Sequence, residues 1–243
     1  MKSFIPWIGG KNLLANRIIS MFPDNFSRYI EVFGGGGAVL FHGQRHANLE
    51  VYNDRNSDLV NLFRCAKFHR AELQREIDGY FNSREVFDEI QAKMTLSGFT
   101  DIQRAGMFFV TARLSFGANM RTFGGRQRNL SADCLTDVET RLKNVVIENL
   151  DFGELIKQYD CDSSLFYCDP PYCQTERYYN KTFTRDDHAR LKAILSQISG
   201  KFILSYNDSE FIREMYRDFE IIAVERQNNL ANGWYSELII KNF

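Results

Sequence analysis

The chain has 243 residues, enough for one large α/β domain or for one domain that carries a sizeable insertion. Hydrophobic residues make up 44% of it and aromatic residues 14%, which provides a substantial core and argues against global disorder. The formal net charge is −1. This value neither requires nor excludes a nucleic-acid partner, because a basic face can be balanced elsewhere.

Cysteine usage and hydropathy argue against several further classes of protein. The five cysteines include no C-x-x-C pair, so neither a disulfide scaffold nor a zinc site is indicated. No stretch approaches the roughly 18 apolar residues of a membrane helix, and the N-terminal segment lacks the apolar run of a signal peptide. We therefore expect a reducing cytoplasm as the compartment and no membrane partner.

Short runs of β-branched and aromatic residues predict seven strands. In chain order they cover residues 28–33, 49–53, 144–149, 164–168, 201–205, 220–224 and 237–240. Apolar residues at helical spacing predict helices over 57–68, 72–81 and 186–198. Strands that alternate with helices predict an α/β fold, with a mostly parallel seven-stranded sheet and helices on both faces.

The middle of the chain differs from the rest. Residues 61–142 show helical or irregular patterns and no convincing strand. They are predicted to form an inserted, mainly helical domain between the second and third strands. The main domain is then made of residues 1–60 and 143–243.

Four glycines, 34–37, directly follow the first predicted strand and are expected to open a helix. Glycine lets a ligand approach the backbone closely, and a helix N-terminus offers free N–H groups. Asp54 follows the second strand about 20 residues later, where an acidic side chain can accept hydrogen bonds from ribose hydroxyls. These features favour a nucleotide or adenosyl ligand at the carboxyl ends of the strands. A flexible turn at the glycines and a helix-capping role for Asp54 are the simpler alternatives.

Asp169, Pro170, Pro171 and Tyr172 directly follow the apolar strand at 164–168. The two prolines stiffen the loop and remove two backbone donors, while their carbonyls remain as acceptors. A carboxylate beside such carbonyls can accept both hydrogens of an exocyclic amino group and direct the nitrogen lone pair at a methyl donor. An aromatic ring beside it can stack on an extruded base. We expect these four residues to be catalytic, in preference to a simple proline-rich turn.

This loop resembles the catalytic motif of the amino-methyltransferases, and the glycine loop resembles their cofactor motif. Residues 7–11, W-I-G-G-K, resemble the W-x-G-G-K segment of the Dam-like, alpha-group, adenine-specific DNA methyltransferases. Residues 147–152 resemble that family's segment for the adenine of the cofactor. The motif order matches over nearly the whole chain outside the insertion. The resemblance implies a Rossmann-like S-adenosylmethionine-dependent methyltransferase fold, with residues 61–142 as the target-recognition domain.

The resemblance also implies which residues contact the cofactor, S-adenosylmethionine. They are Trp7, Gly9, Lys11, Phe33, Gly34, Gly35, Asp54, Asp151, Phe152 and Asp169. Among them, Asp151 and Phe152 would hold the adenine ring of the cofactor. Asp169, Pro170 and Tyr172 would receive the target adenine. Without the resemblance, a lone Lys at a helix start is usually solvated and a Trp is usually core.

Between Asp101 and Asp133 the chain holds five arginines and neither a lysine nor an acidic residue. The local charge of about +5 favours contact with DNA phosphates, and Asn and Gln in the same window can read base edges. The residues expected to bind DNA are Arg113, Asn119, Arg121, Arg126 and Arg128; Arg104 completes the five arginines. A solvated basic loop is the alternative. Only the two outer arginines of 113–121 match the family's GATC readers, so no recognition sequence is predicted.

We expect a site-specific DNA methyltransferase that transfers a methyl group from S-adenosylmethionine to N6 of a flipped adenine in duplex DNA. The expected products are N6-methyladenine and S-adenosylhomocysteine, formed by direct in-line attack without a covalent enzyme intermediate or a metal. Within the resemblance, Asp169 favours adenine, because cytosine-N4 enzymes usually carry Ser there and protein-glutamine and many RNA methylases usually carry Asn. A non-catalytic DNA-binding protein on a methylase fold is the alternative from another class.

The expected partner is double-stranded DNA, with a cognate restriction endonuclease as a candidate second partner. A bacterial or phage-encoded, nucleoid-associated chain that is a monomer or weak dimer is expected. His42 and His46 stand four residues apart, but a surface or capping role is favoured over metal binding. For residues 178–181 two interpretations stand equally: a segment that closes over the flipped base, or a mobile surface segment.

Overall fold

The computed structural model of the chain describes residues 1–125, 130–172, 183–227 and 234–243. The seven strands are β1 (Arg28–Glu31), β2 (Leu49–Asn53), β3 (Val145–Glu148), β4 (Ser164–Cys168), β5 (Lys201–Asn207), β6 (Glu220–Gln227) and β7 (Trp234–Lys241). The α-helices are α1 (Ala15–Ile19), α2 (Ser57–Phe68), α3 (Arg70–Asp78), α4 (Arg84–Met94), α5 (Asp101–Leu114), α6 (Leu135–Leu142), α7 (Phe152–Tyr159), α8 (Arg185–Leu195) and α9 (Glu210–Met215), with a 3-10 turn, η1, at Phe116–Ala118. All seven predicted strands are confirmed.

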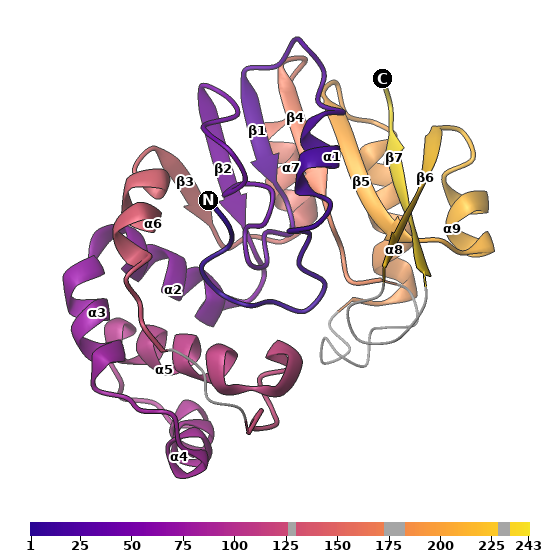
Figure 1. Cartoon of the computed structure of the whole chain (residues 1–243). Helices are drawn as coiled ribbons and strands as arrows, with labels where there is room; N and C mark the ends of the chain where they lie inside the picture. The colour runs from indigo at the N-terminus through magenta and orange to yellow at the C-terminus, as the bar shows by residue number, and fades with distance from the viewer. Residues whose placement is uncertain (126–129, 173–182, 228–233) are drawn as a thin grey trace.

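The strands form one sheet in the order β3-β2-β1-β4-β5-β7-β6 (Figure 1). Neighbours from β3 to β5 run parallel, whereas β7 runs antiparallel to both β5 and β6. The predicted α/β class and mostly parallel sheet are therefore confirmed. Because the five parallel strands point the same way, their carboxyl ends lie along one edge, where open α/β sheets bind ligands.

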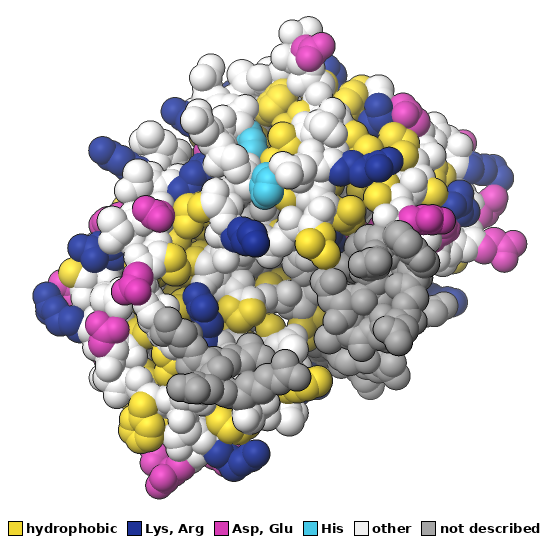
Figure 2. All heavy atoms as spheres, in the orientation of Figure 1, with side chains coloured by type: hydrophobic (Ala, Val, Ile, Leu, Met, Phe, Trp, Pro, Cys, Tyr) yellow, Lys and Arg dark blue, Asp and Glu magenta, His cyan; other side chains and the backbone are white. Residues whose placement is uncertain are grey.

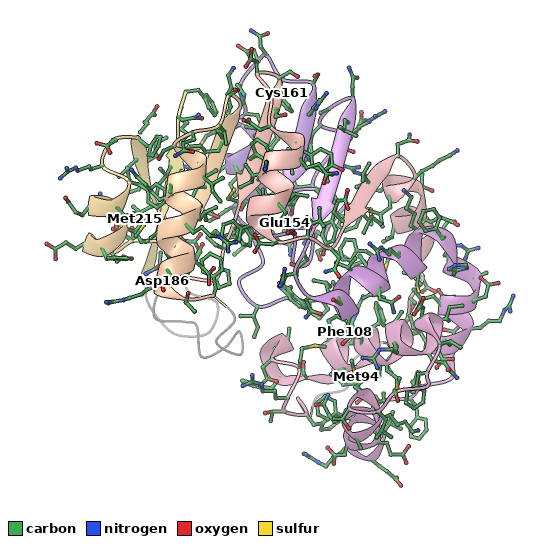
Figure 3. All side chains as sticks on the ribbon, turned by 180° about the vertical axis from the view of Figure 1, so that it is seen from behind. Met94, Phe108, Glu154, Cys161, Asp186 and Met215 are labelled. Atoms are coloured by element: carbon green, nitrogen blue, oxygen red, sulfur yellow. The ribbon has the colours of Figure 1, made fainter. Side chains whose placement is uncertain are left out.

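The two faces of the sheet carry separate hydrophobic clusters, because successive strand side chains point to opposite faces. Phe166 and Cys168 of β4 pack with α7 and α8, which lie side by side behind the sheet, with Glu154 on α7 and Asp186 on α8 (Figure 3). Leu165 and Tyr167 face the opposite cluster. This second cluster extends without a break into the helices between β2 and β3.

Helices α2 to α6 gather as one group beside β3 (Figure 1). Helix α5 lies at its centre and packs against α2, α3 and α4, which explains why residues from Ala105 to Ala112 are buried on every side of the helix. Thr100 and Gln103 form a reciprocal capping box at its start. Helix α2 begins at Ser57 and packs on both α5 and β3, so the predicted domain boundary at residue 61 falls inside this helix.

The helix expected directly after the glycines is wrong. Residues 35–41 form successive turns instead, with the Gly37 N–H donating to Gly34 O at 2.8 Å. Gly35 and Gly37 have φ of 49° and 68°, in the left-handed region, which a right-handed helix cannot include. In the described ranges, no helix is long and apolar enough to cross a membrane.

Candidate active site

The loops after β1, β2 and β4 meet at the carboxyl edge of the parallel strands. They carry the glycine turn, Asp54 and Asp169, respectively. The N-terminal segment crosses this edge, where the Ser3 Oγ donates to both Ile5 O and Gly36 O. Three predicted motifs that are distant in sequence are therefore brought to one place by strand order.

Asp169 accepts hydrogen bonds on both carboxylate oxygens. The ammonium of Lys11, 158 residues away in sequence, lies 2.8 Å from Oδ2, and Ser205 Oγ donates to Oδ1 at 2.7 Å. Lys11 is 4% exposed and also donates to Gly9 O at 2.9 Å, so it forms a buried ion pair rather than a solvated side chain. The Asp169 carboxylate is therefore held in place from two sides by side chains of this chain.

Tyr172 lies on the other side of the Lys11 ammonium. The Lys11 Nζ is 4.7 Å from the ring centroid, within cation–π range, and the phenol donates to Glu237 Oε2 at 3.1 Å. Burial, followed by the negative charges of Asp169 and Glu237, raises the pKa of Tyr172 well above its usual value. The hydroxyl therefore remains a protonated donor and the ring a neutral stacking surface.

The glycine turn is covered by Trp7. A Cβ on Gly35 would lie 2.7 Å from Trp7 Cδ1, so this close approach requires glycine. The Gly35 N–H donates to Asp54 Oδ2 at 2.8 Å, and the Asn56 N–H donates to Oδ1 at 2.8 Å. Asn56 is the N-cap of α2, so the helix-capping alternative for Asp54 does not hold. Burial raises the pKa of Asp54, although these N–H groups act against the shift.

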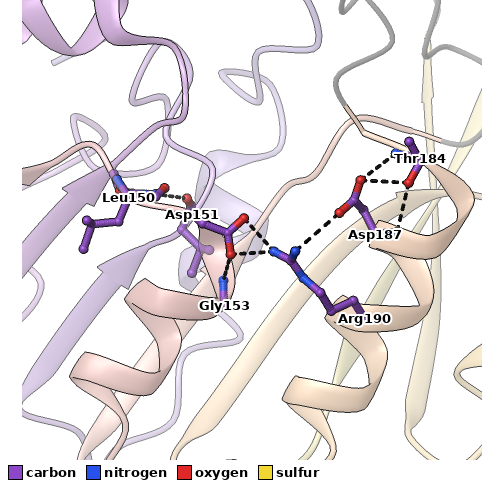
Figure 4. A network of polar contacts seen from close by, with 8 residues as sticks. Leu150, Asp151, Gly153, Thr184, Asp187 and Arg190 are labelled. Atoms are coloured by element: carbon purple, nitrogen blue, oxygen red, sulfur yellow. Dashed lines mark hydrogen bonds and ion pairs between the residues drawn. The ribbon is translucent and has the colours of Figure 1, made fainter.

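Three aromatic rings cluster beside the ends of β1 and β3. The centroids of Phe33, Phe152 and Phe183 lie 5.6 to 5.7 Å from one another. Asp151 caps α7 by accepting from the Gly153 N–H at 2.9 Å, and Arg190 of α8 donates to its two oxygens at 2.5 and 2.6 Å (Figure 4). Phe33 and Phe152, two of the residues expected to contact the cofactor, are thus in ring contact, with Asp151 next to Phe152 in the chain.

Arg190, which the sequence did not indicate, contacts two of the predicted site residues. Burial of Asp151 acts to raise its pKa, but the Arg190 guanidinium and the Gly153 N–H hold that pKa below its usual value. The same guanidinium lies 4.0 Å from the centroid of Phe152 and 3.7 Å from Asp187. Arg190 therefore fixes both residues expected to hold a cofactor adenine.

Glu31 is a further buried acid near this edge. Burial raises its pKa to about 8, while the Tyr29 hydroxyl, which donates to Oε2 at 2.8 Å, acts in the opposite direction. The charge of Asp169 adds to the rise. Glu31 is therefore protonated over much of the neutral range, which limits the negative charge beneath Asp169.

Among the described arginines of the window, Arg104 and Arg113 are both engaged by other groups of this chain. Arg104 pairs with Asp58 at 2.9 Å, and Arg113 donates to Phe4 O at 2.9 Å while lying 5.0 Å from the ring of Phe109. Both guanidiniums are therefore bound to partners in this chain, although Arg104 stays partly exposed. On the face seen in Figure 2, described Lys and Arg side chains are interspersed with Asp and Glu rather than gathered into one patch.

Residues 114–124 form a tight loop at the end of α5. Asn119 Oδ1 accepts from the backbone N–H groups of Arg121 and Thr122, both at 2.9 Å, and Ser115 pairs with Phe123 in an isolated β-bridge. This arrangement leaves Phe116 59% exposed and Arg121 exposed at the surface. The Asn119 side-chain oxygen therefore shapes the loop.

Three sets of predicted residues need separate mention. Arg126, Arg128 and residues 178–181 lie outside the described residues. His42 and His46 interact with Asn16 Oδ1 at 2.6 Å and Val39 O at 2.9 Å. Over the described ranges, no group of three or more His, Cys, Asp or Glu side chains could hold a metal ion.

Comparison with known proteins gives consistent matches over this whole architecture. A family model described as D12 class N6 adenine-specific DNA methyltransferase matches residues 7–230. A Type II methyltransferase from Lactococcus lactis subsp. cremoris is 26% identical over 280 residues, covering 100% of this chain and 96% of that protein. A Type II methyltransferase from Paramecium bursaria Chlorella virus is 25% identical over 263 residues, covering 100% of both. A DNA adenine methylase from Haemophilus influenzae is 26% identical, covering 96% of this chain and 88% of that protein.

Proposed function

Because this chain belongs to the D12 class of N6 adenine-specific DNA methyltransferases, we propose that it transfers a methyl group from S-adenosylmethionine to N6 of a flipped adenine in duplex DNA. The observation that carries the proposal is the junction of Asp169 with Lys11 and Tyr172 at the carboxyl edge of the sheet. At this junction Asp169 can accept hydrogen bonds from an amino group, and the Tyr172 ring can stack on a flat base. The glycine turn lies at the same edge.

The residues beside this junction fit the cofactor. Trp7 packs directly on Gly35, and the Asp54 carboxylate accepts the Gly35 N–H, so the glycine turn, an indole ring and a carboxylate lie together. Phe33 and Phe152 supply an apolar wall for a purine, with Asp151 at its edge. S-adenosylmethionine, when bound, supplies a methyl group on a positively charged sulfur. We assign a set of residues to the binding of this cofactor. They are the carboxylates Asp54, Asp151 and Asp169, the rings Phe33 and Phe152, and Trp7, Gly9, Lys11, Gly34 and Gly35.

Asp169 is the acceptor for the target amino group. Each carboxylate oxygen has two lone pairs, so the bonds from Lys11 and Ser205 leave capacity for the two N6 hydrogens. Accepting these hydrogens increases the electron density on N6 and orients its lone pair. Pro170 and Pro171 hold the loop rigid, and Tyr172 stacks on the base. The base must leave the duplex stack to reach this loop.

The loop at 114–124 is the part of the insertion that we assign to the DNA duplex. Exposed Arg121 can contact a phosphate, and exposed Phe116 offers an apolar ring beside it. Arg113 supports the loop from within, because its bond to Phe4 O ties the end of α5 to the N-terminal segment. Arg126 and Arg128 stay predictions for the same duplex.

Partner and compartment are proposed from the relatives. Two of those named above are Type II methyltransferases, which supports a cognate restriction endonuclease as partner. A bacterial or phage-encoded, nucleoid-associated monomer or weak dimer in the cytoplasm remains the expectation. Size-exclusion chromatography with light scattering, with and without DNA, tests the oligomeric state.

Replacing Asp169 tests the proposed function. Asp169→Ala should lower methyl incorporation into DNA about 10³-fold or more, because the acceptor for N6 is lost, while cofactor binding partly persists. The assay uses labelled S-adenosylmethionine, DNA from a methylation-free host and calorimetry for the cofactor. Asp162→Ala, at the opposite end of β4 and exposed, is the matched control. Undiminished incorporation by Asp169→Ala would contradict the assignment, and cofactor binding with no turnover by the wild type would favour a non-catalytic DNA-binding protein.

A further inference from the structure

Glu237 is a fully buried acid in the first half of β7, with 0% of its side chain exposed. A carboxylate removed from water costs several kcal/mol unless charged or hydrogen-bonding partners compensate it. It directly precedes the apolar run of β7 formed by Leu238, Ile239 and Ile240. A fully buried acid in an apolar strand indicates a role other than the burial of apolar surface.

Strand direction places Glu237 at the ligand edge. Strand β7 is antiparallel to β5, so its first residues, rather than its last, lie beside the carboxyl end of β5. Glu237 pairs with Asn207, the final residue of β5, whereas Lys241 pairs with Ile203 near the other end. The antiparallel strand thereby delivers a side chain to the edge that otherwise collects the ends of parallel strands.

Glu237 touches two members of the catalytic junction at once. Its Oε2 accepts the Tyr172 hydroxyl at 3.1 Å and lies 4.0 Å from the Lys11 ammonium. The ammonium in turn lies 2.8 Å from Asp169 Oδ2 and 4.7 Å from the Tyr172 ring centroid. One cation therefore stands between two carboxylates and beside one aromatic ring.

A neutral side chain at position 237 would reproduce only one of these two contacts. Glutamine in the same place could accept the Tyr172 hydroxyl, but it would not attract Lys11. With the second carboxylate gone, Asp169 alone would attract the ammonium. The charge of Glu237 thus opposes the attraction of Lys11 to Asp169, while its hydrogen bond fixes the direction of the Tyr172 phenol.

We propose that Glu237 is a positioning residue for methyl transfer, which sets the plane of the Tyr172 ring and the place of the Lys11 ammonium relative to Asp169. This inference rests on the proposed function. Since the ring is the surface on which the target adenine stacks, its tilt decides where N6 meets Asp169. Glu237 acts on the rate of the chemical step through Tyr172 and Lys11 and does not itself touch the base.

A double-mutant cycle between Glu237 and Tyr172 tests this role. Glu237→Gln is nearly isosteric, and Tyr172→Phe keeps the ring but removes the hydroxyl. Each change should lower the single-turnover rate of methyl transfer about tenfold, since small misplacements of reacting groups cost about that much or more. The cofactor Kd should stay within about threefold and the Tm within a few degrees. In the double variant the two losses should not multiply, because both act through one shared contact.

Glu220→Gln is the matched control, because Glu220 belongs to the same ladder but is exposed and paired with Lys241 at the far end of β7. Its rate should equal that of the wild type. A rate for Glu237→Gln within twofold of the wild type, or losses that multiply in the double variant, would overturn the inference alone. Absence of any transfer by the wild-type chain would overturn the proposed function as well.

Discussion

Two charged regions of this molecule behave in opposite ways. At the carboxyl edge of the sheet, Lys11, Asp169 and Glu237 come from opposite ends and the middle of the chain, yet both carboxylates lie within 4.0 Å of the Lys11 ammonium. In the insertion, Arg104 and Arg113 are only nine residues apart on α5, yet one pairs with Asp58 and the other with Phe4 O. The carboxyl edge of the sheet collects residues from a parallel strand, an antiparallel strand and the N-terminal segment, whereas a helix distributes neighbouring residues over different faces.

Formal charge in a stretch of sequence is therefore a poor guide to the field at the protein surface. The arginine window has a formal charge of about +5, but a guanidinium that is paired inside the protein contributes little to a field at the surface. The carboxyl edge of the sheet has fewer charges, those of Lys11, Asp169 and Glu237, and each of them has a specific partner. Four substitutions test whether the two regions differ as their contacts indicate.

The largest effect is expected from Lys11→Met. This change leaves buried Glu237 and partly buried Asp169 without their shared cation, so kcat/KM should fall about 10²- to 10³-fold. The free energy of unfolding should fall by about 3 kcal/mol for the same reason. Steady-state methylation and denaturant unfolding measure the two quantities. Lys2→Met, at an exposed position, is the control, and a loss of less than threefold in kcat/KM would place Lys11 outside the catalytic junction.

Arg113→Ala separates a structural arginine from a DNA-binding one. Loss of its bond to Phe4 O and its contact with Phe109 should lower the free energy of unfolding by about 2 kcal/mol. The salt dependence of DNA binding should not change, because no phosphate contact is removed. Denaturant unfolding and DNA titration at several salt concentrations measure these effects. A flatter salt dependence with unchanged stability would return Arg113 to the DNA surface.

Glu31→Gln tests whether the Glu31 carboxyl carries a proton in the folded chain, through the pH dependence of stability. The ordinary pKa of a glutamate carboxyl is 4.5, and burial raises the pKa of Glu31 to about 8 in the folded chain. Between these values the folded chain holds a proton that the unfolded chain has released, so stability decreases as pH rises and levels out above pH 8. The Glu31 contribution to this slope is at most about 1.4 kcal/mol per pH unit. Urea unfolding from about pH 5 to 9 should show a flatter profile for Glu31→Gln, because the titrating group is removed; parallel profiles would contradict the shift.

The smallest effect is expected from Arg121→Ala. This exposed side chain contributes little to stability, so the Tm should not change. DNA affinity should fall a few-fold at about 0.1 M salt, and the slope of log K against log salt should decrease by about 1, as expected for one phosphate contact. Fluorescence anisotropy with duplex DNA measures both. An unchanged slope would mean that Arg121 and Arg113 are alike in not touching DNA.

Much of the fold and the centre of the site follow from sequence, because their signals are local and repeated. Each strand is a short apolar run, and the loop at 169–172 follows such a run directly. The helix expected after the glycines failed because the backbone there needs positive φ at Gly35 and Gly37. That requirement comes from the turn over Trp7, which only the folded chain defines.

Partners of buried charges could not be predicted in the same way. Arg190 and Glu237 lie in elements whose apolar patterns indicate only a helix and a strand. Their importance arises from Asp151 and Tyr172, which approach them through tertiary packing. The one signal for Glu237 in the sequence was an acid beside an apolar strand run, and nothing there indicated that β7 runs antiparallel.

The most direct test of adenine-N6 methylation by this chain is the identity of the methylated nucleoside. DNA from a methylation-free host is incubated with the wild-type chain and S-adenosylmethionine, digested to nucleosides and analysed by mass spectrometry, with Asp169→Ala in parallel. We expect N6-methyladenine with the wild type and almost none with the variant. N4-methylcytosine as the product, or no methylated nucleoside from a chain that binds the cofactor, would contradict this expectation.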